Sequence, residues 1–217
     1  MKKYFCLFVC VILGITCFSQ NGTIEQDPSA KIILDQVFAK IKKNRTMQVK
    51  ISGIETLEST KSSESFKGFY YFKNNSYKYT TKDLEITDDS KSQWVYFPNE
   101  SEVSITKSES NEIFALNPNN LFTLYEKLNY ELPNEYTKNG KKFVSIKLIS
   151  RTSSIKVIYL HINKLTSEIV SVKILFNGVS IIINIDEIKT DVEIDDNMFI
   201  FDKTKYPVGT NFNIETD

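Results

Sequence analysis

The sequence predicts an α+β fold, a single domain in which a long antiparallel sheet carries a small helical cap. Apolar residues recur at helical spacing near the start of the chain, and from Met47 onward they mostly alternate with polar residues, as in strands with one buried face. Asn177-Gly178, the preferred type I′ hairpin turn, separates two of these alternating stretches. No Pro/Gly/Ser-rich linker divides the chain, so one domain is expected.

The first element after the targeting segment is predicted to be an amphipathic helix. Asp27 is a good N-cap residue and Pro28 is tolerated at the first helical position. The apolar residues that follow at helical spacing are Ala30, Ile33, Leu34, Val37, Phe38 and Ile41. A strand should then begin at Met47, because the period changes to two residues there.

Strands account for most of the remaining pattern. Residues 66–79 predict an aromatic-rich hairpin, and residues 84–86, 93–98 and 103–105 predict further strands. Asn117 is the expected N-cap of a short helix that contains Leu121 and Leu124. Residues 144–148, 158–162, 170–176 and 179–185 predict a C-terminal antiparallel meander.

The N-terminal segment has the pattern of a cleaved signal peptide. Met1-Lys2-Lys3 is positively charged and residues 4–18 are free of charge, a run shorter than a membrane-spanning helix requires. We expect cleavage between Ser19 and Gln20, which divides the chain into a signal peptide, residues 1–19, and an exported domain, residues 20–217. Gly14-Ile15-Thr16-Cys17 fits a lipoprotein signal poorly, so a soluble product is expected.

Composition excludes several classes of function. Lys and Arg number 27 against 27 Asp and Glu, so the chain offers no basic footprint for nucleic acid. Its glycines form no phosphate-binding loop. His161 is the only histidine, and Cys6, Cys10 and Cys17 all leave with the signal peptide. We therefore expect no metal, no cofactor and no nucleic-acid partner.

The sequence contains no convincing catalytic group. His161 lies on an alternating strand, and no Gly-x-Ser-x-Gly motif accompanies it. Asp88-Asp89 precedes Ser90-Lys91, a pattern typical of a solvent-exposed turn, and the same interpretation applies to Asp195-Asp196. The protein is therefore expected not to be an enzyme, and an exported hydrolase remains the enzymatic alternative.

Aromatic residues are the more informative signal. They crowd two predicted strands, and over residues 69–72 both faces of the sheet are apolar or amphipathic. One explanation is a packed core on one face and exposed tyrosines on the other. The alternative is a cavity, in which helices cover a curved sheet without filling it and aromatic walls enclose an apolar ligand.

The order of these motifs resembles the LolA family of periplasmic lipoprotein carriers, in particular its divergent LolA-like branch. The segments that carry the resemblance are Gly68-Phe69-Tyr70-Tyr71-Phe72-Lys73, Asp89-Ser90-Lys91-Ser92-Gln93-Trp94-Val95-Tyr96-Phe97-Pro98, Phe199-Ile200-Phe201 and Pro207-Val208-Gly209. The chain departs from the family at Ser90, where a glycine is usual, and at Asn74-Asn75, which replaces an Arg-Pro pair. The family's arginine latch for the helical lid is therefore not expected, and Lys73 and Lys78 are the candidates to replace it.

The resemblance implies an incomplete β-barrel closed by a few helices, with an apolar cavity for acyl chains. It also implies a monomeric periplasmic carrier that receives acylated lipoproteins or lipid from an inner-membrane release complex and delivers them to an outer-membrane acceptor. Helix period and strand parity supply the candidate wall residues, which are Ile33, Val37, Phe38, Ile41, Val49, Ile51, Tyr70, Phe72, Trp94, Tyr96, Leu121 and Leu124.

Two alternatives stay open among binding proteins. One is a LolA-like carrier or sensor for another lipid, such as a glycolipid or a pigment precursor. The other is an outer-membrane-anchored receptor resembling LolB, which would need the lipoprotein signal that Gly14-Ile15-Thr16-Cys17 matches poorly.

Overall fold

The computed structural model describes residues 25–108, 125–150 and 155–214. Its α-helix is α1, Pro28–Lys42, and three short 3-10 helices are η2, Tyr125–Lys127, η3, Asp196–Phe199, and η4, Lys203–Lys205. The strands are β1 Thr46–Leu57, β2 Ser62–Lys73, β3 Ser76–Thr81, β4 Glu85–Asp88, β5 Ser92–Phe97, β6 Glu102–Lys107, β7 Asn129–Tyr130, β8 Asn134–Lys138, β9 Lys141–Ile149, β10 Ile155–Asn163, β11 Glu168–Phe176, β12 Val179–Thr190 and β13 Asn211–Ile214. The short helix predicted from Asn117 lies outside the described residues.

The predicted amphipathic helix is confirmed as α1. The Asp27 side chain caps it by accepting hydrogen bonds from the backbone N–H groups of Ser29 and Ala30, at 2.9 and 3.0 Å. Leu34, Val37 and Phe38 are buried on the face that looks toward the sheet. No α-helix in the described part of the chain is long and apolar enough to cross a membrane.

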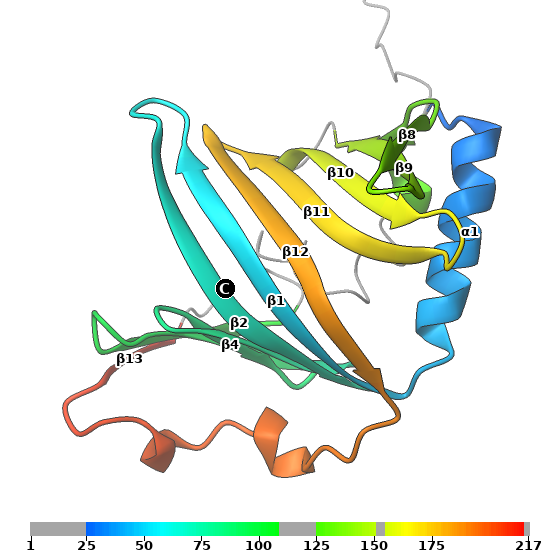
Figure 1. The fold of residues 1–217 in the computed structure, drawn as a ribbon. Helices are drawn as coiled ribbons and strands as arrows, with labels where there is room; N and C mark the ends of the chain where they lie inside the picture. Colours follow the sequence, from blue (N-terminus) through cyan, green and yellow to red (C-terminus); the bar gives the residue numbers. More distant parts are fainter. Residues whose placement is uncertain (1–24, 109–124, 151–154, 215–217) are drawn as a thin grey trace, which may run out of the picture.

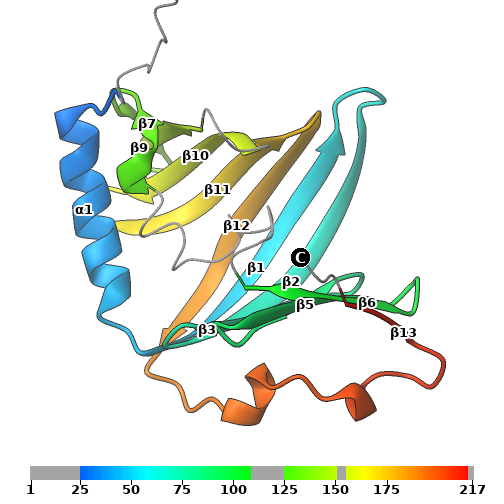
Figure 2. The same ribbon diagram turned by 180° about the vertical axis from the view of Figure 1, so that it is seen from behind.

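The strands form one large, curved sheet that does not close on itself (Figure 1). Its order is β13-β6-β5-β4-β3-β2-β1-β12-β11-β10-β9-β7, with β8 pairing to β9. All pairs are antiparallel except β13 with β6, which lie side by side in Figure 2. The predicted α+β class, an incomplete β-barrel capped by helix, is confirmed.

The turn between β11 and β12 explains why these two strands form a tight hairpin. Asn177 and Gly178 have φ angles of 43° and 79°, the left-handed values that a type I′ turn requires at both central positions. This confirms the turn that the sequence predicts. The hairpin pairs Phe176 with Val179 and continues as far as Ser171 with Asn184.

The two faces of the sheet have different covers. The inner face looks toward α1, which stands along one side of the sheet next to the β10–β11 turn (Figures 1 and 2). The outer face of β3–β5 is covered by the C-terminal segment, residues 191–214, which contains η3 and η4. Trp94 contacts Phe201 and Tyr96 contacts Tyr206 under this segment, with ring centroids 5.5 and 5.0 Å apart.

Ser90 occupies a backbone conformation that favours glycine, with a φ angle of 71°. A non-glycine residue in this left-handed conformation costs about 1–2 kcal/mol. Replacement by glycine removes that cost, but glycine loses more backbone freedom on folding, which offsets part of the gain. We therefore expect Ser90→Gly to raise the free energy of unfolding by about 0.5–1 kcal/mol, which corresponds to an increase of about 1–4 °C in melting temperature. Ser92→Gly in β5 is the control and should lower the free energy of unfolding. A lower melting temperature for Ser90→Gly would contradict the prediction.

Candidate ligand-binding cavity

A cavity of about 220 Å³ lies between α1 and the inner face of the sheet. Its apolar wall consists of Phe38 and Ile41 from α1, Met47, Val49 and Ile51 from β1, Tyr70 and Tyr79 from β2 and β3, Ile169, Val172 and Ile174 from β11, and Ile183, Ile185 and Ile188 from β12. Lys40, Asn44, Ser167, Glu168 and Thr190 supply the polar part of the lining. A wall of this composition suits an apolar ligand.

Part of the predicted wall lines this cavity, namely Phe38, Ile41, Val49, Ile51 and Tyr70. Val37 and Phe72 do not line it but are buried in the hydrophobic core to which Phe38, Ile51 and Tyr70 also belong, and Ile33 packs against that core. Leu121 and Leu124 lie outside the described residues.

Trp94 and Tyr96 do not face the cavity, so the predicted parity of their strand is wrong. The ladder runs from Tyr70 through Tyr79 and Ile86 to Val95, which places Val95 on the inner face. Trp94 and Tyr96 alternate with Val95 and therefore point outward. There they line a separate pocket of about 150 Å³ under the C-terminal segment.

The wall that β11 and β12 supply was not predicted. The signal was present, because Val172 and Ile174 share one face of their strand, and Ile183 and Ile185 share one face of the next. Periodicity placed these residues on a buried face without indicating what they face. Only the pairing of β12 with β1 brings them opposite Phe38 and Ile41.

The solvent-exposed rim of the cavity, where Ile188 and Glu168 are about half exposed, lies next to the place where β11 and β12 part. Their pairing ends at Ser171 with Asn184, whereas β12 continues along β1 to Thr190. A shift in the β1–β12 register leaves Asp186 without a counterpart on β1, and a shift between β10 and β11 leaves Val170 without one on β10. Bulges bend a strand and increase its twist. Bulges on both strands at the same level therefore account for the opening, which we call the mouth.

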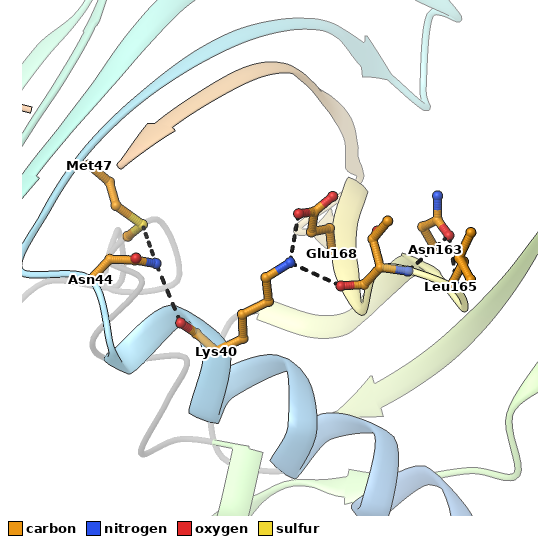
Figure 3. A network of polar contacts seen from close by, with 7 residues as sticks. Lys40, Asn44, Met47, Asn163, Leu165 and Glu168 are labelled. Carbon is orange, nitrogen blue, oxygen red and sulfur yellow. Dashed lines mark hydrogen bonds and ion pairs between the residues drawn. The ribbon is translucent and has the colours of Figure 1, made fainter. Parts of the chain in front are cut away.

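A polar contact ties α1 to the β10–β11 turn at the mouth (Figure 3). Lys40 Nζ lies 2.7 Å from Glu168 Oε1 and donates to the Thr166 carbonyl at 3.0 Å. The hydrogen bond from Lys40 lowers the pKa of Glu168. Both side chains are about half exposed, and exposed ion pairs contribute about 1 kcal/mol or less. The contact positions the helix without locking it.

Neither lysine considered as a replacement for the family's latch reaches α1. Lys73 Nζ donates to the Ile194 carbonyl and pairs with Asp196, both at 2.8 Å, so it holds the C-terminal segment on the outer face. Lys78 pairs with Glu85 at 2.8 Å. Lys40 is the lysine that links the helix to the sheet.

The polar groups next to the cavity form a buried array beyond Tyr70. The Tyr70 ring stacks on Tyr77 with centroids 5.7 Å apart, and Tyr77 accepts a hydrogen bond from Gln93 Nε2 at 2.7 Å. Burial raises the pKa of Tyr70 well above its ordinary value, and no described residue bonds its hydroxyl. Tyr70 therefore stays neutral and serves as an apolar wall.

Asp88 is buried, which corrects the expectation of a solvent-exposed pair at Asp88-Asp89. Asp88 is 1% exposed, and its side chain accepts hydrogen bonds from the Ser90 backbone N–H and the Ser108 hydroxyl. Burial raises the pKa of Asp88. Asp89 caps the same turn by accepting from the backbone N–H groups of Lys91 and Ser92. Both acids therefore have structural partners in the turn.

His161 lies on the outer face, 3.1 Å from the Tyr136 hydroxyl. Burial, together with Lys138 and Lys173, lowers the pKa of His161. Asp195 caps η3 by accepting from the Asn197 backbone N–H. Within residues 25–108, 125–150 and 155–214, no three His, Cys, Asp or Glu side chains come together as a metal site would require.

Fold and cavity together define the class of the protein: a single α-helix in the described part of the chain lies beside an open curved sheet, with an apolar cavity between them. No protein-family model and no curated protein matches the sequence. Among solved structures, an uncharacterized conserved protein from Thermus thermophilus is similar with a TM-score of 0.57 and 13% identity, over 86% of this chain and 99% of that one.

Two further structures are similar at lower scores. A putative outer membrane lipoprotein-sorting protein domain from Vibrio parahaemolyticus has a TM-score of 0.43 and 13% identity, over 78% of this chain and 97% of that one. A LolA superfamily protein from Nitrosomonas europaea has a TM-score of 0.42 and 10% identity, over 79% of this chain and 97% of that one. Both descriptions agree with the family that the sequence motifs resemble.

Proposed function

We propose that this protein is a periplasmic carrier that binds the acyl chains of lipoproteins, or of another lipid, in the cavity between α1 and the sheet. The observation that carries the proposal is the apolar wall of that cavity, which is open at the mouth between β11 and β12. In this role the carrier takes its ligand from an inner-membrane release complex and gives it to an outer-membrane acceptor. No covalent chemistry is needed for either step.

The size of the cavity sets how much of an acyl chain it holds. An apolar cavity of about 150 Å³ binds benzene, so by proportion this one takes roughly nine carbon atoms. Each buried methylene contributes about 0.8 kcal/mol, or roughly 7 kcal/mol for that length before the costs of binding. The rest of a longer chain would extend into the mouth. Affinity of this order allows capture and also transfer to an equally apolar acceptor.

Native mass spectrometry of protein purified from the periplasm, followed by lipid extraction, tests the proposal. We expect bound acylated species, a chain that begins at or next to Gln20, and displacement of a fluorescent acyl probe by palmitate. The signal must come from the probe, because Trp94 lies on the outer face under the C-terminal segment. Protein that carries no lipid and binds no acyl probe would contradict the proposal, and acyl chains attached at Cys17 would indicate a receptor instead.

A further inference from the structure

The part of β12 beyond the hairpin has one edge without a strand. On one side β1 pairs with it as far as Met47 with Thr190. On the other side β11 pairs with it only up to Ser171 with Asn184. Residues 185–190 therefore present a free edge, since no strand in the described part of the chain pairs with it. In a strand, half of the backbone N–H and C=O groups point to each edge.

This free edge borders the mouth of the cavity. Ile185, Ile188 and Thr190 line the cavity from β12, while Ser167 and Glu168 line it from the opposite side. A ligand whose acyl chain enters between these two walls passes directly along the unpaired backbone of β12. The bulge at Asp186 marks the point at which the edge becomes free.

An unpaired strand edge recognises extended polypeptide, because its backbone groups form hydrogen bonds with an added strand. A free fatty acid has no backbone to offer. An acylated lipoprotein has both parts, an acyl group for the cavity and a polypeptide that continues from it. Backbone pairing also depends little on side chains, so one edge can accept many cargo sequences.

We propose that residues 185–190 of β12 bind, as an added strand, the extended polypeptide that follows the acylated N-terminus of a lipoprotein. This inference rests on the proposed carrier function and assigns its cargo to acylated polypeptides. The cavity then supplies general affinity for the acyl chain, and the β12 edge distinguishes lipoprotein from free lipid.

Peptide chemistry gives the sharpest test, with the unmodified full-length mature protein. An N-palmitoyl peptide of six residues is compared with two versions that carry N-methyl groups on alternate amides, one in each register. A strand that pairs along one edge uses every second N–H. The version methylated on the paired amides should therefore bind about ten-fold more weakly or worse, and the version methylated on the other amides should lose much less affinity. Equal affinities for all three peptides, or an equal loss in both registers, would overturn the inference.

Hydrogen exchange locates the contact. Amides of residues 185–190 should become protected when the palmitoyl peptide binds and should stay unchanged with palmitate. β13, the edge strand at one end of the sheet, is the internal control and should not respond. Protection of β12 by palmitate alone, or none with the peptide, would overturn the inference while leaving acyl binding intact. Failure of palmitate and of every acyl peptide to bind would instead refute the carrier function, and the inference with it.

Discussion

Phe38→Glu is expected to destabilise the fold severely, whereas Ile188→Glu is expected to fold normally and to lose acyl binding. Phe38 lines the cavity, but it is only 2% exposed and packs against Tyr125 with ring centroids 4.6 Å apart. A glutamate there loses this packing and buries a charge among apolar side chains. Losses of about 3–5 kcal/mol are typical of such changes, against a total stability of about 5–15 kcal/mol.

Ile188 also lines the cavity, but it is 44% exposed at the mouth. A glutamate at this position keeps its carboxylate in water, so the cost in stability should be about 1 kcal/mol or less. It places a charge where an acyl chain enters, and we expect probe affinity to fall at least ten-fold.

Ile54→Glu is the matched control, because Ile54 is 46% exposed and lies on the outer face of neighbouring β1. This variant should fold and bind as the wild type does. Circular dichroism melts and probe titrations on the same preparations measure both effects. A stable Phe38→Glu variant, or an Ile188→Glu variant with full affinity, would show that the cavity wall is misplaced.

The helix was predictable because its signals are local. Asp27 and Pro28 mark its start, and the spacing of Leu34, Val37 and Phe38 fixes its buried face. The hairpin turn at Asn177-Gly178 was predictable for the same reason, since both positions need positive φ angles.

The parity of the aromatic strands was not predictable, because both faces of this part of the sheet are covered. Val95 faces inward toward the core, while Trp94 faces outward toward Phe201. An alternating pattern identifies a face only when the other face meets water. The residues that cover the outer face lie about one hundred positions later in the sequence, so no local pattern could relate them to Trp94.

The mouth was not predictable from the sequence either. It depends on bulges at Asp186 and Val170, and neither position carries the glycine or proline that often marks an irregular strand. Periodicity alone describes β11 and β12 as a regular hairpin. The pairing with β1 shows that β12 continues beyond the end of its pairing with β11 and leaves an opening there.

Val172→Phe is expected to weaken acyl binding at least ten-fold and to leave the fold as stable as before or more stable. Val172 is half-buried on the inner face of β11 and lines the cavity. A larger side chain there enters a space of about 220 Å³ that protein atoms do not fill. Substitutions that fill a cavity commonly add about 0.5–2 kcal/mol, and the same ring occupies part of the volume that an acyl chain needs.

Ile146→Phe provides the contrast, because Ile146 is 0% exposed in β9 and is not part of the cavity wall. Extra volume in a filled core costs about 1–3 kcal/mol, which for a protein of this size lowers the melting temperature by several degrees. At temperatures at which Ile146→Phe remains folded, its acyl affinity should stay within about two-fold of that of the wild type. Thermal melts and acyl-probe titrations of both variants distinguish a true cavity from a packed core. If Val172→Phe destabilises the protein as much as Ile146→Phe does, the space between α1 and the sheet is already filled in solution and cannot hold an acyl chain.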